Sequence, residues 1–72
     1  MAFDYSKLRG RIKEMYGTQD AFAEAIGIGR VSLSEKLNNK VEFRQREINK
    51  SCEVLEIPID EMTDYFFKLE VR

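Results

Sequence analysis

Apolar residues recur every three or four positions along most of the chain, which is the spacing of helices with one buried face. This pattern predicts five short helices that pack together as one all-α domain. Their expected ranges are residues 4–16, 19–25, 30–38, 44–55 and a short stretch after residue 60. The residues expected in the core are Leu8, Ile12, Met15, Phe22, Ala23, Ile26, Leu33, Leu37, Ile48, Cys52, Leu55, Met62, Tyr65 and Phe66.

Residues 67–72 follow a different pattern, because apolar and charged side chains alternate there with the period of a half-buried strand. A lone strand needs a partner, and no second strand is evident in this chain. The segment is therefore either a frayed end or a dimerisation arm that pairs with the same segment of a second chain. A two-fold antiparallel pairing centred on Leu69 sets Lys68 opposite Glu70, which is favourable. Residues 1–66 then form the domain. The candidate interface residues are Tyr65, Phe66, Phe67, Leu69 and Val71.

The charge of the chain changes the picture only when its distribution is considered. The 72 residues include 12 Lys and Arg against 13 Asp and Glu, a net charge of −1 that disfavours nucleic acid as a partner. Residues 1–52, however, carry ten bases and seven acids, whereas residues 53–72 carry two bases and six acids. This asymmetry indicates a moderately basic face and an acidic end, or equally an ordinary solvated surface.

Composition also limits the chemistry. A single Cys, with no leader and no long apolar run, indicates a reducing, cytoplasmic setting and no membrane partner. Without His, and with Cys52 expected on an apolar helix face, we expect no enzyme and no catalytic residue. The same count leaves no metal-ligand set, and the Gly-Ile-Gly triplet lacks the rest of a nucleotide-binding fingerprint. No cofactor or small-molecule substrate is expected.

The connection between the second and third predicted helices carries the functional signal. It consists only of Gly27, Ile28 and Gly29, so the two helices must cross steeply, and the small Ala23 allows them to approach closely. This geometry is typical of a helix-turn-helix, in which the second helix of the pair enters the major groove of DNA. The motif spans about residues 18–38.

The stretch TQDAFAEAIGIGRVSLSEKLNN, residues 18–39, resembles the helix-turn-helix of Cro and repressor-type bacteriophage regulators. The matching features are Gln19, Ala23, Gly27, the Gly-Ile-Gly turn, Leu33 and the later segment at residues 55–62. This resemblance implies a compact five-helix, lambda-repressor-like DNA-binding domain. Lys36 departs from the family, which usually places an apolar residue there. We expect Leu37 to supply the packing and Lys36 to extend along the surface.

The resemblance makes the third helix the recognition helix. With Leu33 and Leu37 turned inward, its outer face would read base edges, Arg30 pairing with guanine and Glu35 accepting from cytosine. Flanking residues would contact phosphates. The predicted DNA-binding residues are Gln19, Arg30, Val31, Ser32, Ser34, Glu35, Asn38, Lys40 and Arg44. Asn38 is equally suited to ending the helix.

Two functions remain open at this stage. The leading one is a sequence-specific transcriptional regulator that resembles the Cro-like repressors of a phage lysis–lysogeny switch and binds a double-stranded DNA operator as a homodimer. The alternative is a protein-binding modulator, an antirepressor or corepressor, that forms a complex with a phage repressor. The low net charge and the acidic, aromatic C-terminal third favour this alternative. Either protein would act in the cytoplasm of a bacterial host.

Overall fold

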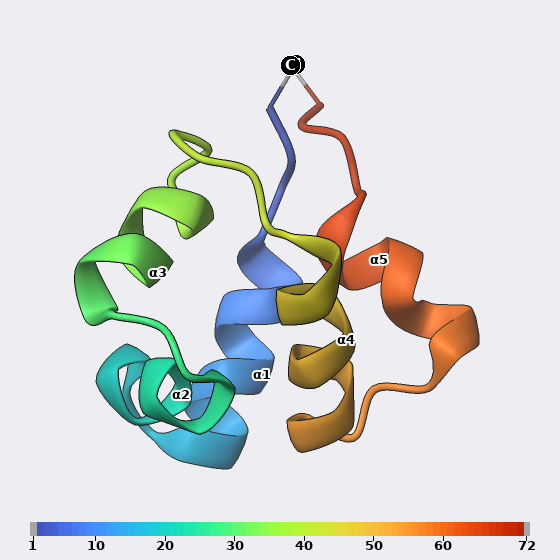
Figure 1. Ribbon diagram of the computed structural model, residues 1–72. Helices are drawn as coiled ribbons and strands as arrows, with labels where there is room; N and C mark the ends of the chain where they lie inside the picture. The colour runs from blue at the N-terminus through green and yellow to red at the C-terminus, as the bar shows by residue number, and fades with distance from the viewer. Residues whose placement is uncertain (1, 72) are drawn as a thin grey trace.

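A computed structural model of the chain describes residues 2–71 and consists of short helices around one core (Figure 1). The elements are α1 (Ser6–Tyr16), α2 (Gln19–Ile26), α3 (Arg30–Leu37), α4 (Gln45–Val54), a 3₁₀ turn (Ile59–Glu61) and α5 (Met62–Phe66). The predicted five-helix, all-α fold class is confirmed. No helix within the described range is both long and apolar enough to span a lipid bilayer.

Helix α2 lies at the centre of the fold and packs against α1, α3 and α4. Its Phe22 and Ala23 are fully buried, and the small side chain of Ala23 allows the close approach that the sequence predicts. The prediction for Met15 is wrong, because Tyr16 turns toward Phe22 at the end of α1, with 5.7 Å between ring centroids, and Met15 stays exposed. The buried apolar residues are Tyr5, Leu8, Ile12, Phe22, Ala23, Leu33, Leu37, Ile48, Leu55, Ile57 and Phe66.

Local signals define the start and end of α2. The Thr18 hydroxyl accepts a hydrogen bond from the backbone N–H of Ala21 at 3.2 Å, so it caps the helix. At the other end Gly27 has φ +77°, a left-handed conformation that glycine adopts without strain. The N–H of Ile28 then bonds to the C=O of Ala23 at 3.0 Å. The chain therefore leaves α2 sharply and enters α3 after two further residues.

The C-terminal tail pairs within its own chain, which corrects the prediction that this chain offers it no partner. Phe3 and Leu69 form an antiparallel bridge. The N–H of Asp4 donates to the C=O of Lys68 at 2.6 Å, and the N–H of Glu70 donates to the C=O of Ala2 at 3.1 Å. The first residues are too few to show an alternating pattern, so this pairing is invisible in the sequence. Residue 72 of the predicted arm lies outside the described range.

Asn39 fixes the opposite side of the N-terminal segment. Its Oδ1 accepts from the N–H of Phe3 at 2.8 Å, and its Nδ2 donates to the C=O of Phe3 at 2.9 Å. The backbone of Asn39 has φ +61°, which Asn tolerates better than most residues. The side-chain amide of Asn39 thus forms the two hydrogen bonds that a neighbouring strand would otherwise form with Phe3. The first residues lie between the tail and the loop that follows α3 (Figure 1).

Replacing Asn39 with alanine is expected to destabilise the fold by about 1–3 kcal/mol, because two backbone groups lose their partner and alanine is strained at positive φ. Urea unfolding measures the change. Asn49→Ala on the exposed side of α4 is the matched control and is expected to have little effect. Equal stability of the two variants would show that the amide does not secure the N-terminal segment.

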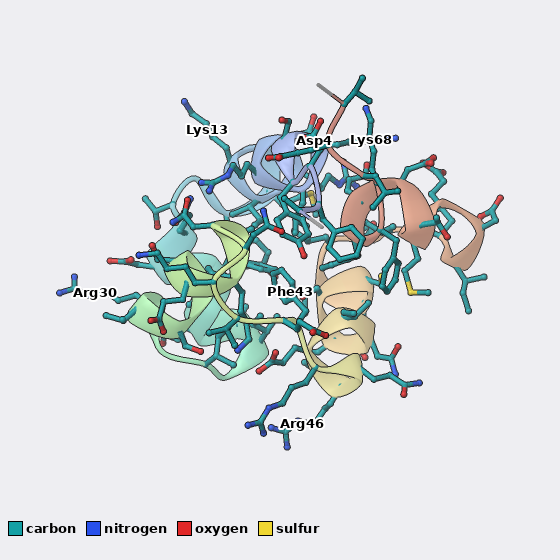
Figure 2. All side chains as sticks on the ribbon, turned by 90° about the horizontal axis from the view of Figure 1, so that it is seen from above. Asp4, Lys13, Arg30, Phe43, Arg46 and Lys68 are labelled. Carbon is teal, nitrogen blue, oxygen red and sulfur yellow. The ribbon has the colours of Figure 1, made fainter. Side chains whose placement is uncertain are left out.

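A line of aromatic rings lies beneath the two paired ends of the chain. Phe3 contacts Phe67 edge-on with 5.9 Å between centroids, Tyr5 contacts Phe43 at 5.4 Å, and Phe43 contacts Phe66 at 5.3 Å. Phe43 lies near the middle of the molecule in Figure 2. Such T-shaped pairs add stability beyond the area they bury. Four of these five rings lie outside the helices, namely Phe3, Tyr5, Phe43 and Phe67, so helical periodicity did not identify their packing.

Candidate functional site

The predicted helix-turn-helix is formed by α2 and α3, and the structure gives α3 the orientation expected from its sequence. Leu33 and Leu37 are buried against the core. The opposite side of the helix faces solvent, and Val31 is 66% exposed there. The exposed residues on this side are Arg30, Val31, Ser34 and Glu35, which we call the α3 face. Val31 is the one apolar side chain among these four residues.

Arg30 begins α3 and points away from the body of the molecule (Figure 2). One guanidinium nitrogen lies 3.7 Å from a carboxylate oxygen of Asp20 on α2, and both side chains are largely exposed. An ion pair this exposed contributes little stability, but it places a negative charge beside the predicted base-reading cation. Gln19, predicted to contact a phosphate, is partly buried at the start of α2.

Lys36 is buried, which corrects the expectation that it extends along the surface. It is 4% exposed, and its Nζ lies 3.5 Å from Oε1 of Glu47 on α4. Lys36 also donates to the hydroxyl of Ser32 at 3.1 Å. The Ser32 hydroxyl, which is predicted to contact DNA, therefore already has a hydrogen-bond partner inside the protein. The same Glu47 oxygen accepts from the N–H of Arg44 at 2.9 Å and caps α4. A carboxylate from another helix therefore makes a charged residue possible where the related family has an apolar one.

Asn38 has the structural role that the sequence left open as an alternative. Its Nδ2 donates to the C=O of Ser34 at 2.8 Å, and its Oδ1 accepts from Arg9 at 3.2 Å. The same nitrogen of Arg9 donates to the C=O of Leu37 at 3.1 Å. These bonds end α3 and fasten it to α1. They also commit the Arg9 guanidinium to carbonyl and amide oxygens of its own chain.

The remaining cations do not gather on the α3 face. Figure 2 shows Lys13, Arg30 and Arg46 pointing outward on different sides of the molecule. Lys40 and Arg44, both predicted to contact phosphate, are exposed in and after the loop that follows α3. Arg46 and Lys50 line a shallow cleft with Ile26 and Gly27 at the end of α2, and Lys13 lines another with Thr18 and Gln19 at its start. These cations therefore flank α2 rather than cover the α3 face.

The predicted interface residues near the C-terminus fall into two groups. Phe66 is 2% exposed and belongs to the core, which corrects its assignment to an interface: it packs against Phe43. Tyr65 is partly buried, and Nζ of Lys7 lies 4.7 Å from its ring centroid. The exposed members are Phe67, Leu69 and Val71. An open cleft of about 350 Å³ adjoins Phe67 and is lined by Phe43, Gln45, Ile48, Asn49, Met62 and Phe67.

Two titratable groups illustrate how local contacts set charge. The hydroxyl and N–H of Ser6 both donate to the Asp4 carboxylate and lower its pKa, which keeps this group ionised just before α1. Burial raises the pKa of the Cys52 thiol, so this side chain stays protonated at neutral pH and packs as a small apolar group.

Comparison with known proteins adds a family. Residues 1–69 match the family described as protein of unknown function (DUF739). The chain belongs to this family. This DUF739 chain is also similar to the solution structure of the modulator of repression (MOR) of the temperate bacteriophage TP901-1 from Lactococcus lactis. The two are 43% identical with a TM-score of 0.81, over 100% of this chain and 97% of that chain. No curated protein matches the sequence.

This likeness confirms the expected relation to phage regulators at the level of a phage regulatory protein. The DUF739 chain resembles the relative over its whole length, so helix-turn-helix and tail are both within the similar region. The Cro-type assignment, an operator and a homodimer are finer statements and stay predictions.

Proposed function

We propose that this DUF739 chain is a modulator of repression that acts by binding a phage repressor protein. The full-length similarity to TP901-1 MOR supports this class of function. The observation that carries the proposal is the charge of the helix-turn-helix. Residues 18–38 contain the exposed acids Asp20, Glu24 and Glu35, and Arg30 is their one exposed base.

This charge disfavours DNA as the main partner. A protein that binds duplex DNA neutralises phosphates with Lys and Arg, and most of its non-specific affinity comes from that term. Here Lys36 is buried against Glu47, and Arg9 is bonded to the end of α3. The acids beside Arg30 repel phosphates. The α3 face that would approach the duplex therefore offers one base, Arg30, balanced by one acid, Glu35.

The α3 face instead has the features of a protein-binding patch. Val31 supplies an exposed apolar centre, and Arg30 and Glu35 supply charges of both signs at its edge. An apolar centre with a polar rim is the usual organisation of protein interfaces, and Arg is enriched among their energetically dominant residues. We therefore assign repressor binding to this face.

Operator DNA is the second candidate partner. Arg30 points into solvent from the N-terminal end of α3, where a recognition helix contacts bases. The exposed Lys40 and Arg44 lie nearby in sequence and are available for phosphates. These features support a DNA contact made in addition to the repressor, since the charge of residues 18–38 disfavours DNA binding by this chain alone.

The deciding experiment measures binding of the purified chain to the repressor encoded beside it and, separately, to its own upstream DNA. We expect Val31→Asp to weaken repressor binding by at least about 30-fold, because it places an uncompensated charge at the centre of the patch. Ile59→Asp, at an exposed residue on the turn before α5, is the matched control and is expected to leave binding unchanged. DNA binding by the chain alone is expected to be negligible at about 0.15 M salt.

The opposite outcome is equally specific. Steeply salt-dependent binding to the upstream DNA, lost in Arg30→Ala and absent with random duplex, would overturn the proposal and support the operator-binding candidate. Repressor binding that Val31→Asp leaves intact would remove the α3 face from the interface.

A further inference from the structure

We infer that the outer edge of the tail, residues 67–71, is a self-association surface and that its occupant is the same edge of a second copy of this chain. This inference concerns a surface separate from the α3 face. It therefore stands or falls independently of the repressor-binding function.

The hydrogen bonds of the tail show that one of its edges is unused. The inner edge pairs with the first residues of the chain through the C=O of Lys68 and the N–H of Glu70. Backbone groups of successive residues point to opposite edges of a strand, so the N–H and C=O of Leu69 point to the outer edge. Among the residues that the structure describes, neither group has a backbone partner. Leu69 thus offers one donor and one acceptor at an open edge.

The sequence around Leu69 is complementary to itself. In an antiparallel pair with Leu69 opposite Leu69 of the second copy, the two residues exchange both N–H to C=O bonds. Lys68 then lies opposite Glu70 of the other copy, and two-fold symmetry repeats this favourable pair. Within its own chain Lys68 already lies opposite Asp4, whose charge it attracts. In the dimer, Asp4, Lys68 and Glu70 of the second copy would therefore lie side by side, with the charge alternating from acid to base to acid.

The other face of the tail supplies apolar area. Phe67, Leu69 and Val71 are all exposed. Leu69 and Val71 share one face because side chains alternate along a strand. Phe67 ends α5 and lies beside them, because its ring packs edge-on against Phe3, the bridge partner of Leu69. In this register Val71 of the second copy lies beside Phe67, so an aromatic and a β-branched side chain can pack together. In each copy the first residues and the tail form two paired segments, and the dimer joins the two pairs into one four-stranded ribbon. Such a ribbon is more stable than an isolated two-stranded pair. Two edges of five residues each form a small contact, and interfaces below about 1,200 Å² are typical of weak complexes, so we expect a weak dimer.

The first measurement is sedimentation velocity of the full chain from about 10 μM to about 1 mM, a range that spans weak association. We expect the sedimentation coefficient to rise with concentration. Amide hydrogen exchange over the same range identifies the edge: the N–H of Leu69 is expected to become protected as the dimer forms. The N–H of Glu70, which is bonded within the chain, is expected to be protected throughout. A monomer at every concentration would overturn the proposal.

A charge reversal then tests the register. Glu70→Lys sets Lys opposite Lys68 of the other copy in both halves of the ribbon, whereas within its own chain residue 70 lies opposite Ala2. We expect the dissociation constant to rise about tenfold. Glu24→Lys on α2 makes the same change in net charge away from the tail and is expected to dimerise as the parent chain does. Equal dimerisation of Glu70→Lys and the parent chain would show that association uses another surface.

Discussion

Glu47→Ala is expected to remove about 3–5 kcal/mol of stability, because it leaves the ammonium of Lys36 buried without its counter-charge. The Lys36 and Glu47 side chains are only 5% and 6% exposed, so water cannot take the place of the carboxylate. The substitution also removes the acceptor for the N–H of Arg44 and with it the cap of α4. A chain of 72 residues has a total stability of roughly 4–11 kcal/mol. Much of this variant is therefore expected to be unfolded.

Urea unfolding followed by circular dichroism measures this loss, and two further variants establish its cause. Glu53→Ala breaks the exposed pair with Lys50 and is expected to cost less than about 1 kcal/mol. Lys36→Met combined with Glu47→Leu replaces both buried charges by apolar groups of similar size and is expected to recover most of the stability. A loss in Glu47→Ala no larger than in Glu53→Ala would mean that the pair is hydrated and contributes little.

The helices could be predicted because their signals are local. The Thr18 hydroxyl caps the start of α2, and the left-handed backbone of Gly27 ends it. The spacing of Leu33 and Leu37 determines which side of α3 is buried. The pairing of the tail with the first residues joins segments more than sixty positions apart and depends on where α5 delivers the chain. Residues 2–4 are too few to show an alternating pattern, so their pairing with the tail could not be predicted from the sequence.

The candidate site shows the same division. The α3 face followed from helical spacing, so the exposure of Arg30 and Glu35 was predictable. The burial of Lys36 was not, because it depends on a carboxylate that α4 places opposite it. Likewise the sequence offers Asn38 two roles, as a helix terminator or a DNA contact, and its bonds to Ser34 and to Arg9 on α1 give it the first. Which cations are free to meet a partner is thus a property of the packed structure.

Phe66→Ala is expected to destabilise the fold by about 3–5 kcal/mol, the usual cost of truncating a buried aromatic ring. Phe66 is 2% exposed and packs edge-on against Phe43, whose ring in turn contacts Tyr5. Removing it opens a cavity at the point where α5, the start of α4 and the N-terminal segment meet. The tail follows α5 directly, so its pairing with the first residues is expected to loosen as well.

Thermal and urea unfolding of Phe66→Ala beside Val71→Ala separates a core role from an interface role. Val71 is 91% exposed, so its truncation is expected to change the unfolding free energy by less than about 0.5 kcal/mol. An interface residue shows the reverse behaviour, with unchanged stability of the isolated chain and weaker association. Near-parent stability of Phe66→Ala together with loss of a partner would return Phe66 to the interface. A large loss of stability instead identifies Phe66 as a core residue, as its 2% exposure and its packing on Phe43 lead us to expect.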